Sequence, residues 1–110
     1  MSKSYVAIPD VRALLGEVAE ESIVSRAVYN EANSRAILFG FAPGQELSEH
    51  TTPMAATIHI LEGNATLTLG TDEMEAAPGT LVYMPPSLSH SVHARDQVVM
   101  LLTMIKSARE

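Results

Sequence analysis

The stretch PGTLVYMPPSLSH, residues 78–90, contains the signals that decide the fold. Its opening PG pair favours a turn, and the residues TLVYM that follow favour a short strand. The PP pair then ends that strand, because proline has no backbone N–H to donate within a sheet. The chain resumes as SHSVHA, residues 89–94. This succession of turn, strand, stop and strand is typical of a β structure made of short strands.

The segments on both sides of this stretch continue the strand pattern. IVSRAVYN (23–30) and RAILFGFA (35–42) are rich in β-branched, aromatic and long apolar residues, which predicts a hairpin around the polar EANS. NATLTLG (64–70) alternates polar and apolar residues, and predicts a second hairpin with MEAA (74–77). QVVMLLTMI (97–105) predicts a long, buried closing strand. Eight or so short strands with turns between them predict a closed sandwich or barrel.

One segment near the N-terminus predicts a short helix. Asp10 is placed to cap the free amide groups of VRALLGEV, residues 11–18. Four apolar residues of this segment share one face at helical spacing: Val11, Leu14, Leu15 and Val18. We expect this face to dock the N-terminal arm onto the rest of the protein.

The composition fits one domain and excludes several classes of function. The chain has 110 residues, 46% of them hydrophobic and 18% charged, which suits a single compact core. Its net charge is −6 and its basic residues are scattered, so we expect no nucleic-acid partner. No apolar run is long enough to span a bilayer and the N-terminus lacks the apolar core of a signal peptide, so we expect a cytoplasmic protein without a membrane partner. There is no cysteine, so a metal would need nitrogen and oxygen ligands.

Two stretches have the spacing of a known pair of motifs. The first, residues 43–63, begins with PG, contains His50 and ends with LEG; the second is residues 78–90, ending at His90. Together they resemble the two conserved motifs of the cupin superfamily, and the chain is similar to a small single-domain cupin of the RmlC-like, cupin 2 conserved barrel type. The resemblance covers about residues 36–105.

The resemblance implies an all-β fold: a double-stranded β-helix, or jelly-roll barrel, with a short N-terminal helix. It implies one cupin domain over residues 1–110, in which 36–105 form the conserved barrel. Residues 1–35 then form an N-terminal arm, the short helix and added strands.

The resemblance also implies a metal site with departures from the family pattern. In metal-binding cupins the first motif supplies two histidines separated by one residue and a carboxylate four positions later, and the second motif supplies a further histidine. His50 and His90 keep two of these places, whereas Thr52 and Ala56 occupy the places of the second histidine and the carboxylate. A catalytic site for a divalent metal normally has about three protein ligands, so two imidazoles alone would bind iron, manganese, nickel or zinc weakly.

His59 is a candidate third ligand. In a regular strand Ala56, Ile58 and Ile60 face one side and His59 the other, so His59 reaches the interior only if a bulge shifts the register. Both interpretations stay open: an outward histidine, or an inward ligand. We expect the ligand pocket beside the histidines to be lined by three residues of the first motif: Thr52, Met54 and Ala56.

Two functions of different classes follow. The first is a metal-dependent protein that binds a small organic molecule inside the barrel, with dioxygenase-type or isomerase-type activity. The second is a metal-free module that binds or senses a small molecule, in which the histidines orient the ligand by hydrogen bonds. We expect a homodimer, because the segment 23–30 could pair with the sheet edge of a neighbouring molecule.

Overall fold

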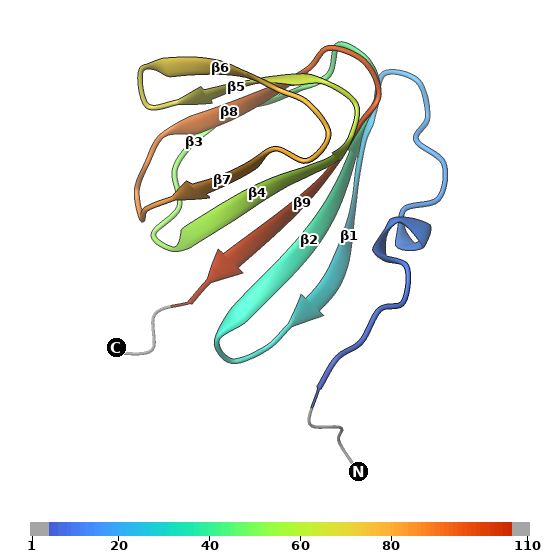
Figure 1. Cartoon of the computed structure of the whole chain (residues 1–110), viewed down its shortest axis with the longest axis vertical. Coiled ribbons are helices and arrows are strands. Elements are labelled where there is room, and N and C mark those ends of the chain that lie inside the picture. The colour runs from blue at the N-terminus through green and yellow to red at the C-terminus, as the bar shows by residue number, and fades with distance from the viewer. Residues whose placement is uncertain (1–4, 107–110) are drawn as a thin grey trace.

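Two antiparallel sheets face each other in the computed structural model, which describes residues 5–106 (Figure 1). Within these residues there are nine strands. The larger sheet has the order β1-β2-β9-β4-β7 and the smaller sheet has the order β3-β8-β5-β6. The strands are β1 (Ile23–Asn30), β2 (Ser34–Phe41), β3 (Glu46–His50), β4 (Ala55–Glu62), β5 (Ala65–Leu69), β6 (Asp72–Ala76), β7 (Leu81–Met84), β8 (His90–Ala94) and β9 (Val98–Ile105). This is the all-β, double-stranded β-helix fold that the sequence predicts.

The predicted hairpins and the closing strand are present. β1 pairs with β2 and β5 pairs with β6, each antiparallel. β9 lies between β2 and β4 at the centre of the larger sheet. Its consecutive residues Val98, Val99 and Met100 are all buried, because the core covers one face of the strand and the N-terminal arm covers the other. A strand covered on both faces has no polar alternation, which explains its continuous apolar sequence.

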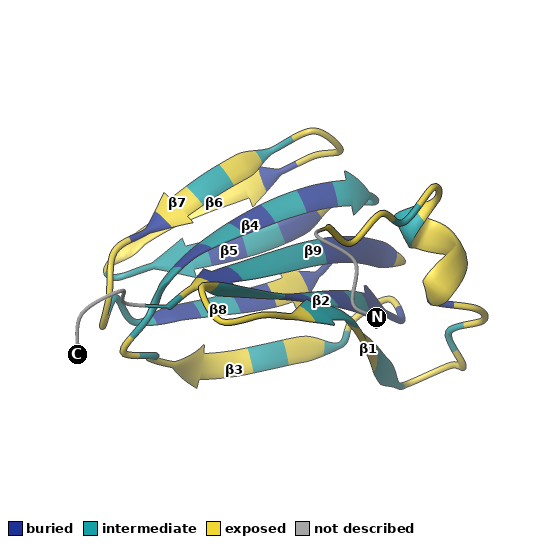
Figure 2. Cartoon of the chain, turned by 90° about the horizontal axis from the view of Figure 1, so that it is seen from below, coloured by how far each residue is buried: buried dark blue, intermediate teal, exposed yellow. Residues whose placement is uncertain are grey.

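The core fills the space between the two sheets. Alternate residues of the strands point inward, as the period of two requires, and Figure 2 shows this on β4 as alternating buried and intermediate bands. The largest of these inward side chains are completely or almost completely buried: Phe41, Ile58, Ile60, Leu67, Met84, Val92, Val98 and Met100. The barrel interior is therefore packed with apolar side chains along most of its length.

The N-terminal arm covers part of the outer face of the larger sheet. Its helical element is a 3-10 turn, η1 (Val11–Leu14), which Figure 2 shows as largely exposed. Leu15 follows η1 and packs with Leu38 and Val99 in a second apolar cluster. A side chain at Gly40 would come within 2.6 Å of Leu15 and Val18 atoms, so glycine at this position lets the arm approach β2 closely.

The helix is shorter than predicted, and the predicted cap is absent. Asp10 makes no side-chain capping hydrogen bond; only its carbonyl accepts, from the N–H of Ala13 at 3.1 Å. Gly16 has a φ of +70° and turns the chain out of the helical conformation. The segment is therefore fixed by the apolar packing of Leu15 and Val18, and it does not form a longer capped helix. In the part of the chain that the structure describes, no helix has the length and apolar character needed to cross a bilayer.

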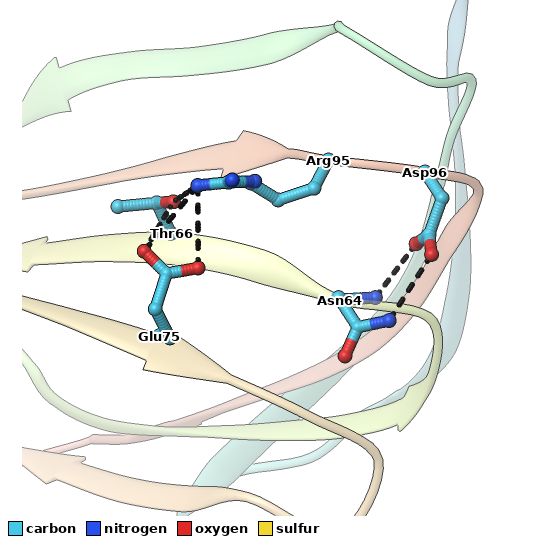
Figure 3. A network of polar contacts seen from close by, with 5 residues as sticks. All are labelled: Asn64, Thr66, Glu75, Arg95 and Asp96. Atoms are coloured by element: carbon cyan, nitrogen blue, oxygen red, sulfur yellow. Dashed lines mark hydrogen bonds and ion pairs between the residues drawn. The ribbon is translucent and has the colours of Figure 1, made fainter.

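Polar side chains join neighbouring segments of the smaller sheet and its turns in the network of Figure 3. Asn64 donates two hydrogen bonds to Asp96, from its backbone N–H to Oδ1 at 2.7 Å and from its side-chain Nδ2 to Oδ2 at 3.1 Å. The backbone N–H and then the side chain of Asn64 hold the pKa of Asp96 below its ordinary value of 3.8. Beside them, Arg95 donates to Thr66 and forms an ion pair with Glu75 on the exposed face of the smaller sheet.

Candidate functional site

His50 and His90 lie side by side on neighbouring strands. His50 is the last residue of β3 and His90 is the first residue of β8, and the two residues are direct partners in the ladder between these strands. Their ring centroids are 4.3 Å apart and the ring planes are inclined by 59°. His90 is 3% exposed and is the buried polar residue of the described core, whereas His50 is exposed. The pair therefore extends from the core to the mouth of the barrel.

The two imidazole rings are held in the same way by the backbone. The Nδ1 of His50 lies 2.9 Å from the carbonyl oxygen of Ser48, and the Nδ1 of His90 lies 2.9 Å from the carbonyl oxygen of Leu88. A carbonyl oxygen only accepts hydrogen bonds, so a ring that makes this contact donates from Nδ1. In the neutral form of such a ring the Nε2 carries a free lone pair. This is the arrangement of metal-binding histidines, whose second nitrogen usually donates to a carbonyl or a carboxylate.

The nearby carboxylates do not add a third metal ligand to the histidine pair. Glu49 precedes His50, and its carboxylate accepts a short hydrogen bond from the hydroxyl of Ser89. Across residues 5–106, no group of three or more histidine, aspartate or glutamate side chains is arranged to hold a metal ion. The protein therefore offers two imidazole nitrogens at this site, and further ligands would come from water or from a bound molecule.

His59 is not brought together with His50 and His90. It lies on β4 opposite Leu101 of β9 and Leu81 of β7, whereas its neighbours Ile58 and Ile60 are buried in the core between the sheets. The ladder between β4 and β9 does contain a register shift, but this shift falls between Ile60 and Glu62, after His59. The bulge that an inward His59 required is thus at the wrong place, and His59 lies on the outer face of the larger sheet.

The three predicted pocket residues lie in different environments. Ala56 is buried in the core beside Met84 and Met104, its partners on β7 and β9. Thr52 is half-buried, and its carbonyl accepts from the N–H of Ser87, which connects the β3–β4 loop to the β7–β8 loop. Met54 packs against the core and also lines an open groove of about 600 Å³ with six other residues: Pro53, Ala55, Tyr83, Pro86, Ile105 and Lys106.

Arg35 is a functional candidate that the sequence reasoning missed, because it was counted among the scattered basic residues. It lies on β2 on the same face as Ile37 and Phe39, which pack against the core. Its Nη2 is 3.6 Å from the sulfur of Met104, a weak acceptor, and its Nε is buried without a hydrogen-bond partner. The signal was available in RAILFGF, where an arginine occupies the apolar face of an alternating strand.

The fold and the position of the histidine pair define a small jelly-roll barrel protein with a candidate ligand site at one open end. The chain belongs to the cupin family: the family model described as "Cupin domain" matches residues 37–106. None of the curated proteins compared matches the chain.

Solved structures of other proteins share the architecture. A cupin superfamily protein from Desulfitobacterium hafniense is 23% identical, with a TM-score of 0.79, over 83% of this chain and 84% of that one. A conserved protein of unknown function from Streptococcus pyogenes is 24% identical, with a TM-score of 0.82, over 96% and 91%. Salicylate 1,2-dioxygenase from Pseudoaminobacter salicylatoxidans is 12% identical, with a TM-score of 0.73, over 80% of this chain and 26% of that one. At these identities the likeness shows the fold alone.

Proposed function

We propose that His50 and His90 together bind one divalent transition metal ion, and that a small organic molecule binds there with it. The observation that carries the proposal is the shared anchoring of the two rings: both Nδ1 atoms bond to backbone carbonyls, and the rings are 4.3 Å apart. Two neutral imidazoles with free Nε2 atoms suit iron, nickel or zinc, and also manganese when oxygen donors are added. The site residues thus fit a metal ion, although they supply only part of its coordination.

The surroundings of the pair suit a bound organic molecule. His90 is buried and fixed, so it provides a rigid ligand, whereas the exposed His50 is accessible from the mouth. The partly buried apolar side chains of Leu69 and Leu88 pack against the core at this end of the barrel. A divalent metal bound here would polarise a carbonyl oxygen or activate water or dioxygen. Dioxygenase-type or isomerase-type activity on a small organic molecule is the reaction class that we propose.

A metal-free binding module is the second candidate. The absence of a three-ligand group among the described residues favours it, as does the occupation of two ligand places of the family pattern by Thr52 and Ala56. In this function each Nε2 would accept a hydrogen bond from a ligand hydroxyl or amide. The histidines would then orient the molecule without chemistry.

Metal analysis separates the two candidates. We would purify the chain without an affinity tag or chelator, offer iron, manganese, nickel and zinc in turn, and measure the bound metal by elemental analysis. We expect near-stoichiometric metal in the wild type, loss of metal in His90→Ala, and retention in His59→Ala, the matched control on the outer face. Absence of metal from the wild type with every ion offered would overturn the metal proposal and favour the second candidate.

We also propose that the chain forms a homodimer through β1. This strand is at one edge of the larger sheet, so one side of its backbone has no partner strand within the described residues. Such an edge is a site for pairing with a second copy. Light scattering at micromolar concentration should give the mass of two chains, and a single monomeric mass at that concentration would contradict the proposal.

A further inference from the structure

The guanidinium group of Arg35 lies at the inner face of the barrel and has no acidic partner among residues 5–106. The two ion pairs within residues 5–106 use other arginines, Arg12 with Glu62 and Arg95 with Glu75. Its hydrogen bond to a thioether sulfur, at 3.6 Å, does not compensate its charge. Arg35 is therefore a half-buried cation whose Nε donor is shielded from water and unused.

A second cation at the same end of the sheet, Lys106, differs from Arg35 because it has oxygen acceptors. Lys106 donates from Nζ to Oδ1 of Asn30 at 2.7 Å and to the carbonyl oxygen of Glu31 at 2.8 Å. Its ammonium group is thus engaged with two good oxygen acceptors. In the described part of the chain Arg35 has no such acceptor, and a buried donor left without one destabilises the folded state. The arrangement is explained if an acceptor arrives with a ligand.

The strand register places Arg35 in the layer of the barrel that contains the histidine pair. Arg35 of β2 is opposite Met104 of β9, Met104 is opposite Ala56 of β4, and Ala56 is opposite Met84 of β7. These four residues form one row across the inner face of the larger sheet. In the smaller sheet the corresponding end row contains His50 and His90 together with Leu69.

The connecting loops show that the two rows are at the same end. The chain runs from His50, the end of β3, to Ala55, the start of β4, through residues 51–54. It runs from Met84, the end of β7, to His90, the start of β8, through residues 85–89. The two loops lie next to each other in Figure 1, and the N–H of Ser87 donates to the carbonyl of Thr52 at 2.8 Å. Arg35 and the histidine pair therefore belong to one mouth of the barrel, on facing sheets.

We propose that Arg35 binds the carboxylate of a small organic acid at this mouth, while the body of the same molecule extends toward His50 and His90. A guanidinium presents its donors in a planar fork that matches a carboxylate. An arginine at this position therefore suits a carboxylate ligand better than a lysine would. Two other residues of the Arg35 row, Met104 and Met84, are apolar core residues and suit an apolar or aromatic ligand body. This inference names the ligand class of the proposed function and rests on it for the role of the histidines.

Nuclear magnetic resonance of the arginine Nε–H groups tests the proposal. The probes are benzoate and benzamide, which have nearly the same shape but differ in charge. In ¹⁵N-labelled protein we expect benzoate to shift the Nε–H signal of Arg35, assigned by its loss in Arg35→Gln, and benzamide to leave it in place. We expect Arg35→Gln to weaken benzoate binding at least about tenfold. Arg26→Gln, which alters an exposed arginine on β1, should leave benzoate binding unchanged. An Arg35 signal that does not respond to benzoate overturns the proposal.

Two further measurements distinguish a loss of benzoate binding from a loss of folding and from a loss of metal binding. Arg35→Met retains the aliphatic stem and removes the uncompensated charge, so its melting temperature should equal or exceed that of the wild type; a clear fall would mean that Arg35 is structural and would count against the proposal. Metal content is measured on the wild type and on Arg35→Gln in parallel. A wild-type protein that binds metal but whose Arg35 signal does not respond to benzoate overturns the role of Arg35 and leaves the histidine proposal intact. A benzoate response in a protein that binds no metal supports the role of Arg35 and overturns the metal proposal.

Discussion

At the scale of single residues, backbone carbonyls rather than side chains orient the two imidazoles of the candidate site. Ser48 and Leu88 each precede the histidine that they hold by two positions, so the strand ends themselves fix the ring orientation. The positions of His50 and His90 could be predicted from motif spacing. Their anchors could not, because a carbonyl acceptor is present at every residue and leaves no signal in the sequence.

Glycine is required at some turns for conformation alone and at one turn also for space. Gly44 and Gly63 have nearly equal φ values, +83° and +80°. An added Cβ at Gly44 meets nothing within 4 Å, whereas at Gly63 it would lie 2.0 Å from the carbonyl oxygen of Gln97. We predict that Gly44→Ala lowers the free energy of unfolding by about 1 kcal/mol through backbone strain alone. Gly63→Ala should cost roughly 3 kcal/mol or more, because the clash is added to the strain.

Urea denaturation of both glycine variants measures this difference, with the wild type as reference. Equal losses for the two variants would contradict the close packing of the LEG turn against Gln97.

At the scale of elements, alternation and turn residues in the sequence predict the strands correctly, but the sequence predicts the N-terminal helix only in part. The hairpins β1–β2 and β5–β6 have strong local signals, since polar turns separate two strand patterns. The segment 11–18 has apolar residues at helical spacing, but it forms a single 3-10 turn because Leu15 and Val18 pack onto β2 at Gly40. Tertiary packing decided the length of this element, and local propensity could not reveal it.

The docking of the arm gives a prediction with a built-in control. Leu15 is 4% exposed in the outer cluster, whereas its neighbour Leu14 is 37% exposed. Leu15→Ala should lower the free energy of unfolding by about 2–4 kcal/mol, since it leaves a cavity beneath the arm. Leu14→Ala should change it by less than about 0.5 kcal/mol. Chemical denaturation measures both, and a Leu14 variant as destabilised as the Leu15 variant would contradict the observed docking.

Asn64 and Asp96 join the turns after β4 and β8 by hydrogen bonds, and these bonds predict that the stability of the fold depends on pH. The hydrogen bonds from Asn64 lower the pKa of Asp96 in the folded protein below its ordinary value of 3.8. The stabilisation is therefore present above the unfolded value and is lost as the pH falls through the folded value. We predict that Asp96→Asn is less stable than the wild type at neutral pH, and that the difference shrinks at strongly acidic pH.

Thermal melts of the wild type and Asp96→Asn between neutral pH and pH of about 2 test this dependence. A difference that stays constant over the whole range would show that the charge of Asp96 does not contribute.

At the scale of the whole molecule, the barrel brings residues from both sheets to one mouth. The family resemblance predicted the jelly roll and the neighbouring His50 and His90, and the structure contains both. Arg35 could not be assigned to the same end of the barrel from the sequence, because its position depends on the register of four strands in the facing sheet. For the same reason the sequence cannot decide whether His59 faces the core or the outside, because this depends on the position of the bulge.

Histidine ¹⁵N spectra can show whether His50 and His90 bind one metal ion through their Nε2 atoms. Long-range ¹H–¹⁵N spectra would be recorded before and after an equimolar amount of Zn²⁺ is added, with His50→Ala and His90→Ala for assignment. We predict that both rings are protonated at Nδ1 beforehand, and that zinc shifts only their two Nε2 signals, leaving His59 and His93 unchanged. Rings protonated at Nε2, or Nε2 signals that do not respond to zinc, would contradict it.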